Sequence, residues 1–283
     1  MNTGQDTTGR VWLITGCSAG FGRAIADVAL ARGDRVVATA RRPEALADLA
    51  GERALVVALD VTRRDEIDAA VDGALERFGR IDVLVNNAGY GSVGAVEEID
   101  MHDLRALMDT MFFGAVALTQ AVLPHMRAQG SGAIVQISSQ GGQLAFAGVG
   151  AYCAAKFALE GLSEAMQAEV APLGIRTLIV EPGSFRTEFG GARMHYSPEI
   201  DAYSDTVGPT RAFLAGADGT QPGDPRKAAA AILAALDAPQ PPLRLALGAD
   251  AVDAIRAKHE RLRGDLDSWE GVSRDTAHEN AQP

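Results

Sequence analysis

The stretch Thr15-Gly16-Cys17-Ser18-Ala19-Gly20-Phe21-Gly22 joins an apolar run, Val11–Thr15, to a segment with helical periodicity, Gly20–Arg32. Glycines allow a tight turn between a strand and a helix, and they let another molecule approach the backbone closely. The first N–H groups of a helix have no partner within the helix and attract anions. The stretch therefore predicts a first β-α unit with a phosphate-binding turn, although turns of this composition also occur with a purely structural role.

The same alternation of strand and helix continues along the chain. Apolar runs rich in β-branched residues predict six further strands, at Arg35–Thr39, Ala54–Leu59, Asp82–Val85, Gly132–Ile137, Ile175–Glu181 and Leu243–Ala246. Helical periodicity is found between them at Asp65–Phe78, Leu104–Arg127, Tyr152–Leu173 and Pro225–Leu236. Because the strands are apolar throughout, helices should cover both faces of the sheet. The pattern predicts an α/β fold: a doubly wound parallel sheet of about seven strands, of Rossmann type, in three layers (αβα), with ligands at the carboxyl ends of the strands.

No repeat or linker divides the chain. We expect a polar arm over residues 1–9, one Rossmann-type domain over residues 10–263 and a polar tail over residues 264–283. The main irregular insertion, at about 188–224, mixes Gly, Pro, Asp and Ser with aromatic residues. Because loops longer than about 15 residues usually bind or cover a ligand, we interpret this insertion as a substrate lid. The tail is interpreted either as an arm that packs on a partner subunit or as a frayed end.

Composition excludes several classes of partner. The 283 residues include 37 acidic and 26 basic side chains, which give a formal net charge of −11. Nucleic acids and anionic membranes repel such a chain, so neither is expected as a partner. The 2 cysteines and 5 scattered histidines have no metal-ligand spacing. No run of about 18 apolar residues predicts a membrane span, and the polar first residues do not resemble a signal peptide. We expect a cytoplasmic protein without a metal.

Four further motifs follow the later strands. They are Asn86-Asn87-Ala88-Gly89, Ser139, Tyr152-x-x-x-Lys156 and Pro182-Gly183-x-x-x-Thr187. Each alone is weak, because Pro182-Gly183 and Asn86-Asn87-Ala88-Gly89 could be plain turns and a Tyr–Lys pair at this spacing occurs by chance in many helices. In this order and together with Thr-Gly-x-x-x-Gly-x-Gly, they resemble the short-chain dehydrogenases/reductases over about residues 10–250. The resemblance implies a Rossmann fold and an NAD(P)-dependent oxidoreductase. The glycine spacing differs from the Gly-x-Gly-x-x-Gly pattern of other dehydrogenases, and it disfavours a nucleotide-sugar epimerase of related fold.

The resemblance implies three catalytic residues: Ser139, Tyr152 and Lys156. Tyr152 and Lys156 are four residues apart, so on a helix they share one face. A tyrosine has an ordinary pKa of about 10, which is high for proton exchange at neutral pH. A lysine about 6 Å away stabilises the phenolate by roughly 2.8 kcal/mol at an effective dielectric of about 20 and should lower that pKa by about two units. Tyr152 is therefore expected to be the acid/base, Lys156 to tune it and bind the nicotinamide ribose, and Ser139 to hold the substrate oxygen.

The residues after the second strand bear on the choice of cofactor. Enzymes that prefer NAD carry an acidic residue there, whereas this chain has Ala40 followed by Arg41 and Arg42. Arginines donate to phosphate oxygens, and the Ser18 hydroxyl adds a donor, so we expect a preference for NADP(H) over NAD(H). The alternative is that both arginines are solvated surface charges. Asp60 resembles the family aspartate that binds adenine, and the alternative is that it caps the following segment.

The resemblance also assigns ligand contacts. The expected cofactor-binding residues are Gly16, Ser18, Gly20, Phe21, Gly22, Arg41, Arg42, Asp60, Val61, Asn87, Ala88, Gly89, Tyr152, Lys156, Pro182, Gly183, Phe185 and Thr187. The expected substrate contacts, for a largely apolar small-molecule carbonyl or alcohol, are Ser139, Leu144, Phe146, Phe189 and Tyr196. Family members pair through their long helices, so Leu104–Arg127 and Tyr152–Leu173 are expected to form a homodimer or homotetramer.

One residue departs from the family pattern. The segment Met111-Phe112-Phe113-Gly114 has methionine where the family usually has an asparagine that organises a water-mediated proton relay to the lysine. Either the relay is weakened or the backbone carbonyl of Met111 still holds the water. The leading hypothesis is a ketone or aldehyde reductase. The alternative is a catalytically impaired dinucleotide-binding regulatory or scaffold protein, for which Met111 is the only support.

Overall fold

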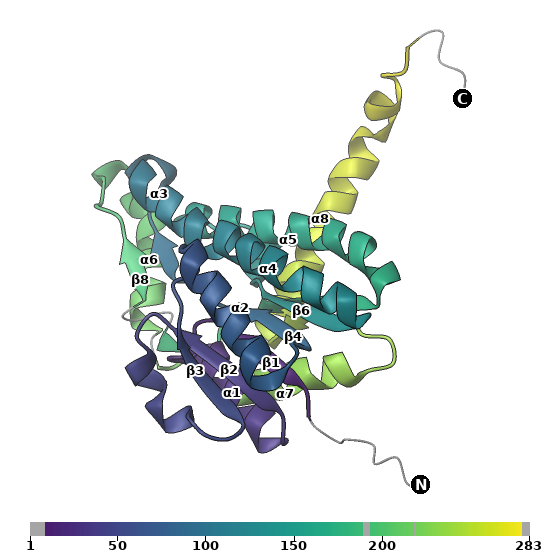
Figure 1. Cartoon of the computed structure of the whole chain (residues 1–283). Coiled ribbons are helices and arrows are strands. Elements are labelled where there is room, and N and C mark those ends of the chain that lie inside the picture. Colours follow the sequence, from purple (N-terminus) through teal and green to yellow (C-terminus); the bar gives the residue numbers. More distant parts are fainter. Residues whose placement is uncertain (1–8, 189–192, 218, 279–283) are drawn as a thin grey trace, which may run out of the picture.

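A computed structural model describes residues 9–188, 193–217 and 219–278 (Figure 1). Its central sheet has seven strands in the order β3-β2-β1-β4-β6-β7-β9, and every neighbouring pair is parallel. The strands are β1 (Val11–Ile14), β2 (Arg35–Ala40), β3 (Ala54–Ala58), β4 (Val83–Asn86), β6 (Gly132–Ile137), β7 (Ile175–Pro182) and β9 (Arg244–Leu247). The doubly wound parallel sheet predicted from the sequence is confirmed, with strand ends that differ by about one residue.

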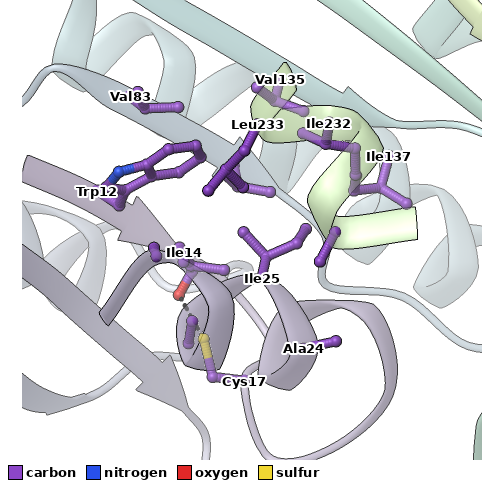
Figure 2. Close-up of a cluster of buried hydrophobic side chains, with 14 of the residues drawn as sticks. Trp12, Ile14, Cys17, Ala24, Ile25, Val83, Val135, Ile137, Ile232 and Leu233 are labelled. Atoms are coloured by element: carbon purple, nitrogen blue, oxygen red, sulfur yellow. Dashed lines mark hydrogen bonds between the residues drawn. The ribbon is translucent and has the colours of Figure 1, made fainter. Parts of the chain in front are cut away.

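Helices cover both faces of the sheet, as the wholly apolar strands require. On one face lie α1 (Gly20–Ala31) and α7 (Pro225–Asp237), and on the other lie α2 (Arg64–Phe78), α4 (Gly114–Gln129) and α5 (Gly150–Val170). Neighbouring residues of β1 point to opposite layers, so Trp12 packs against α1 and α7 while Leu13 packs against α2 and α4. Figure 2 shows the first of these clusters, where Trp12 lies against Leu233 of α7.

The carboxyl ends of the strands form the edge of the sheet that carries the predicted site. In the sheet β1 lies between β2 and β4, so the connections from β1 and β4 leave in opposite directions, which opens a crevice at this edge. Two short strands, β5 (Gly91–Val93) and β8 (Met194–Tyr196), pair in parallel and link the loop after β4 to the insertion. Short helical turns complete the connections: η1 (Pro43–Leu49), η2 (Val96–Glu98), η4 (Gln140–Gly142), η5 (Ala171–Leu173) and η7 (Asp201–Tyr203).

The helix predicted at Leu104–Arg127 differs from the one observed. It begins earlier, as α3 (Met101–Met108), because the Asp100 side chain accepts a hydrogen bond from the N–H of His102 at 2.7 Å and caps it. It then passes through a π-helical segment, η3 (Asp109–Phe113), before α4. A π-helical segment adds one residue to a helix, and the hydrophobic periodicity of the sequence does not reveal it. By length and composition Met101–Gln129 is also apolar enough to cross a membrane, but α4 buries Leu118, Val122 and Met126 against the sheet.

Two regions contain regular structure that the sequence analysis did not predict. The insertion at 188–224 includes β8 and α6 (Ser204–Gly216), although Pro209 lies inside that helix. The long helix α8 (Ala249–Arg274) runs across the predicted boundary between the domain and the tail at residue 264. The polar composition after Gly264 led us to expect a tail there, and in the structure Ala251 is the single buried residue of α8.

Candidate active site

The glycine turn after β1 has a geometry that larger residues would disturb. Gly16 has a φ of +70°, and a Cβ on Gly22 would lie 2.5 Å from Nδ2 of Asn87 and 2.6 Å from the carbonyl oxygen of Gly16. Ala19 precedes α1 without a side-chain hydrogen bond to its first N–H groups. These N–H groups therefore remain available to an anion at the helix start, which fits the predicted phosphate-binding turn.

The Asn86-Asn87-Ala88-Gly89 motif supports this turn. The Thr15 hydroxyl oxygen accepts hydrogen bonds from the N–H groups of Asn87 and Ala88 at 2.8 and 2.9 Å. The Asn87 amide donates in return to the carbonyl oxygen of Thr15 at 2.7 Å. Asn86 donates to the Thr119 hydroxyl of α4 at 2.9 Å. The motif thus ties the ends of β1 and β4 together and fixes the backbone beside the crevice.

Ser139, Tyr152 and Lys156 lie together at the carboxyl end of β6. Ser139 precedes η4, where its hydroxyl oxygen accepts a hydrogen bond from the N–H of Gly141 at 3.0 Å, and it also hydrogen-bonds with Tyr152. Tyr152 and Lys156 share one face of α5, and the Lys156 Nζ atom lies 5.7 Å from the centre of the Tyr152 ring. Nζ donates to the carbonyl oxygen of Ile137 at 2.7 Å, which fixes the lysine at the end of β6.

Burial changes the acidity of this pair in opposite directions. It raises the pKa of the Tyr152 phenol above its ordinary value of 10, although the hydrogen bond with Ser139 lowers it. Burial also lowers the pKa of Lys156 to about 8, against the opposing charge of Glu160. The expectation that the pKa of Tyr152 lies below 10 is therefore wrong for the chain without a bound dinucleotide, because burial disfavours the charged phenolate.

A cavity of about 710 Å³ opens at this edge of the sheet, within the usual range for ligand sites. Twelve of the residues predicted for the site line it: Gly20, Phe21, Asn87, Gly89, Ser139, Phe146, Tyr152, Lys156, Pro182, Gly183, Phe185 and Thr187. The others that the structure describes lie outside this lining: Gly16, Ser18, Gly22, Arg41, Arg42, Asp60, Val61, Ala88, Leu144 and Tyr196. Phe189 lies outside the described residues.

Asp60 and Val61 have local structural contacts. The Asp60 carboxylate accepts hydrogen bonds from the N–H and hydroxyl of Thr62 at 3.0 and 2.7 Å, so it forms the turn before α2 that the alternative interpretation described. Val61 is buried, and a Cβ on Gly114 would lie 2.7 Å from its side chain, so it marks a close crossing with α4. Arg41 and Arg42 are exposed after β2.

The cavity wall opposite the glycine turn is largely apolar. Besides Phe146, it includes residues that the sequence analysis did not select: Val149, Met194, Pro209, Phe213, Leu214, Ala217 and Ala254. Most of these come from α6 and β8, so the insertion does supply part of the wall. Leu144 is buried away from the cavity, and Tyr196 is 38% exposed on β8. Successive side chains of a strand point to opposite faces, and in β8 this turns Met194 toward the cavity. The sequence alone does not give the register of this strand.

Arg193 is a cation near the glycine turn that sequence reasoning missed. Its guanidinium donates to the Ser18 hydroxyl oxygen at 2.8 Å and lies 3.5 Å from the Glu188 carboxylate. Its carbonyl oxygen accepts a hydrogen bond from the N–H of Gly91, so β5 and β8 hold its backbone. Among the described residues that line the cavity, the cations are Lys156 and Arg193. No motif marks Arg193, which lies 175 residues from its partner in sequence.

The turn after β7 is fixed from α8. The Asp250 carboxylate accepts a hydrogen bond from the N–H of Ser184 at 2.7 Å, and a Cβ on Gly183 would collide with it. The Phe185 ring packs on Phe21 with ring centres 5.1 Å apart. The Pro182-Gly183 turn therefore brings the end of β7 against the start of α1. Thr187 lies beside Gly20, since a Cβ added to Gly20 would lie 3.3 Å from the Thr187 side chain.

Met111 lies in η3 and is 2% exposed. Its side chain lines the cavity and packs against Gly89, since a Cβ there would lie 3.4 Å from the Met111 Cγ atom. It belongs to a small apolar cluster with Leu107, Ala151 and Ala155. The methionine thus fills an apolar position beside the helix that carries Tyr152.

A buried group of carboxylates adjoins Lys156. Glu160 follows it by one turn of α5, and Gln143 donates both to Glu160 at 3.2 Å and to Glu181 of β7 at 2.9 Å. Arg244 lies 3.0 Å from Glu160 and 3.4 Å from Glu181. Burial and the neighbouring Glu160 raise the pKa of Glu181 to about 7. Among the described residues, no group of three or more His, Cys, Asp or Glu side chains is placed to hold a metal ion.

This geometry agrees with comparisons to known proteins. Residues 10–195 match the model of the short-chain dehydrogenase family. Oxidoreductase BOA17 of Botryotinia fuckeliana is 42% identical over 268 residues, which cover 93% of this chain and 98% of that protein. The chain belongs to the short-chain dehydrogenase/reductase family. It is therefore an NAD(P)-dependent oxidoreductase by family, and the resemblance noted from its motifs is confirmed.

Two solved structures of this family are similar over nearly the whole chain. A short-chain dehydrogenase from Streptomyces avermitilis has a TM-score of 0.90 and 53% identity and covers 95% of this chain and 100% of its own. A short-chain dehydrogenase from Burkholderia cenocepacia in complex with NADP has a TM-score of 0.72 and 27% identity, and the match covers 92% of this chain and 98% of that one. The Rossmann-type fold of the family is thus shown for this short-chain dehydrogenase/reductase.

Proposed function

We propose that this short-chain dehydrogenase/reductase reduces a ketone or aldehyde to an alcohol with NADPH, in the cytoplasm. The observation that carries this proposal is the Tyr152 phenol, hydrogen-bonded with Ser139 and one helical turn from Lys156, at the wall of the cavity that the glycine turn also lines. A small-molecule carbonyl in that cavity meets a proton donor and a second hydroxyl at one oxygen.

The dinucleotide, when bound, supplies the hydride, and the side chains handle the proton. Tyr152 donates its phenolic proton to the substrate oxygen while the Ser139 hydroxyl holds that oxygen. The raised pKa keeps the phenol protonated at neutral pH, so the proton is present, but it also makes the phenol a weaker acid, and the charge of Lys156 has to offset this. Lys156 then stabilises the tyrosinate that remains, because its ammonium lies 5.7 Å from the ring centre.

The preference for NADP(H) rests on charge. Directly after β2 the chain has Arg41 and Arg42 in place of a carboxylate, and both side chains are exposed, so they are free to contact a ribose phosphate. The Burkholderia cenocepacia relative was solved with NADP. Arg193 supports binding of the pyrophosphate, since it lines the cavity beside Gly20 and contacts Ser18 of the same turn.

The cavity wall favours an apolar substrate. Phe146, Phe213 and Leu214 line the same cavity as Tyr152, and a substrate that fills it buries apolar surface. We further propose pairing of copies through α4 and α5 into a homodimer or homotetramer. Phe113, at the end of η3 just before α4, is 56% exposed, and Phe157 on α5 is 44% exposed.

A scaffold without catalysis is the second candidate. Met111 favours it, because a buried thioether lines the cavity at the position of the family asparagine. The intact group of Ser139, Tyr152 and Lys156 argues against it.

The two candidates are distinguished by binding and turnover measured separately. NADPH and NADH are titrated by fluorescence, and NADPH oxidation is then followed against a panel of ketones and aldehydes, with Tyr152→Phe as the control. We expect tighter binding of NADPH and turnover that Tyr152→Phe abolishes. Binding without turnover on any carbonyl supports the scaffold, and equal or tighter binding of NADH contradicts the assigned cofactor.

A further inference from the structure

The second half of α8 extends away from the rest of the chain (Figure 1). Every residue from His259 to His278 is exposed. Large apolar side chains are among them: Leu262, Leu266 and Trp269 are 48%, 65% and 64% exposed. A lone helix gains little stability in water, and apolar side chains gathered on one face of it usually mark a contact surface.

Five apolar residues of α8 and His259 form a continuous stripe. Val252, Ile255, His259, Leu262, Leu266 and Trp269 follow each other at alternating steps of three and four residues. This is the spacing of the a and d positions of a heptad, which meet the partner helix in a two-stranded coiled coil. We call this stripe the α8 seam. Its spacing fits another helix of the same kind as the partner.

The charges beside the seam select the partner and its direction. Arg263 and Glu270 flank one side of the seam, and Lys258 and Asp265 flank the other. In a parallel pair, Lys258 would face Arg263 and Asp265 would face Glu270, so like charges would meet. In an antiparallel pair centred between Leu266 and Trp269, Arg263 of each helix faces Glu270 of the other, and Leu266 packs against Trp269.

We propose that the second half of the α8 seam, Leu262, Leu266 and Trp269, docks antiparallel on the same residues of a second copy of this chain. The contact is isologous, since the same residues serve both copies about a two-fold axis. Complementary charges on a single helix favour a second copy over an unrelated partner. An anionic lipid surface is disfavoured by Asp265 and Glu270 beside the seam and by the net charge of −11.

Charge reversal in the full chain tests this pairing. Arg263→Glu and Glu270→Arg are made singly and together, and particle mass is measured by sedimentation at micromolar concentration. The pair has two equivalent contacts between residues 263 and 270, and each single change places like charges at both of them. We therefore expect the mass to fall by half. The double change restores opposite charges, so we expect the original mass to return. Glu260→Arg, on the far side of the same helix, is the matched control and should leave the mass unchanged.

Three outcomes overturn the proposal. The first is a wild-type chain that is monomeric under these conditions. The second is single reversals that leave the mass unchanged, and the third is a double reversal that stays at half mass. The last result would show that Arg263 and Glu270 face other surfaces. Because the variants lie beyond the body of the fold, circular dichroism should show nearly full helix content, and Trp269→Asp provides a second, apolar disruption that should also halve the mass.

Discussion

The Lys156 Nζ atom lies 5.7 Å from the centre of the Tyr152 ring, one helical turn along α5. At this distance an ammonium favours the phenolate by about 3 kcal/mol at an effective dielectric of about 20. Burial opposes this attraction and keeps the pKa of Tyr152 above 10, while it lowers the pKa of Lys156 to about 8. The chain alone therefore presents a neutral phenol beside an ammonium that can lose its charge just above neutral pH.

Replacing Tyr152 by phenylalanine removes the proton donor and keeps the ring. We expect kcat for carbonyl reduction to fall by about 10²–10⁴-fold, the usual contribution of a positioned acid. The Kd for NADPH should change by less than about threefold. Steady-state kinetics and a fluorescence titration measure the two effects. Retention of more than a tenth of the activity would show that another group supplies the proton.

The charge of Lys156 gives the reaction a pH dependence. Below about pH 8 the lysine is protonated and stabilises the tyrosinate, and above this pH the charge is lost. We therefore expect kcat/KM for reduction to fall as the pH rises through about 8. A Lys156→Met variant should be slower throughout and should lack this fall. A profile whose alkaline limb persists unchanged in the variant would assign the limb to a different group.

Strand and motif positions followed from the sequence because they depend on local patterns. Apolar strands between amphipathic helices predicted the parallel sheet, and the topology of such a sheet brings the ends of β1, β4, β6 and β7 to one edge. Ser139, Tyr152 and Lys156 were instead found from the resemblance of their motifs to those of the family. The observed crevice then gathers them at the wall of one cavity.

Features that depend on tertiary contacts were missed. Arg193 reaches Ser18 because β5 and β8 pair across a long sequence separation, and no local pattern encodes that register. The expected fall in the pKa of Tyr152 was wrong because desolvation is a property of the folded environment. Helix α8 looked like a tail, since its seam is narrow and its other faces are charged.

Met111→Asn places an amide in an apolar cluster. Met111 is 2% exposed and packs with Leu107 and against Gly89. We expect a loss of about 1–3 kcal/mol of unfolding free energy, because the buried amide lacks matched partners. Turnover should stay within about threefold, since the backbone carbonyl is unchanged in either residue. Thermal unfolding and kcat are compared with Met111→Leu, which keeps the volume. A tenfold rise in kcat for the asparagine variant would instead show that the methionine limits a proton relay.

Arg193 and the arginines after β2 should have separable effects on cofactor affinity. Arg193→Gln removes a charged donor from the place that we propose for the pyrophosphate, which both cofactors share, so Kd for NADPH and for NADH should rise by a similar factor of about tenfold. The Arg41→Ala/Arg42→Ala double variant should weaken NADPH alone.

Arg127→Gln is the control for these titrations, because it removes an exposed cation at the far end of α4. Its affinity for both cofactors should match that of the wild type. If Arg193→Gln weakens only NADPH, then Arg193 contacts the ribose phosphate and not the pyrophosphate.

Glu181 should make stability depend on pH. Its pKa is raised from 4.5 to about 7 by burial and by Glu160. A carboxyl with a raised pKa favours the folded state while it is protonated, so this contribution is lost as the pH rises through about 7, up to about 3 kcal/mol. Glu181→Gln keeps a hydrogen-bond acceptor for Gln143 and cannot ionise. We expect the variant to be more stable than the wild type at pH 8, by roughly 1–3 kcal/mol, and close to it at pH 5.

Denaturant unfolding at the two pH values measures this difference, with Glu164→Gln as the matched control. Glu164 contacts the same arginine, Arg244, at 2.8 Å, but its side chain is 63% exposed, so its neutralisation should have little effect on the pH dependence. Equal loss of stability between pH 5 and pH 8 in the wild type and in Glu181→Gln would mean that Arg244 keeps Glu181 ionised throughout. In that case the buried carboxylates beside Lys156 act as a fixed negative charge, and the alkaline limb of the kinetic profile should move above pH 8.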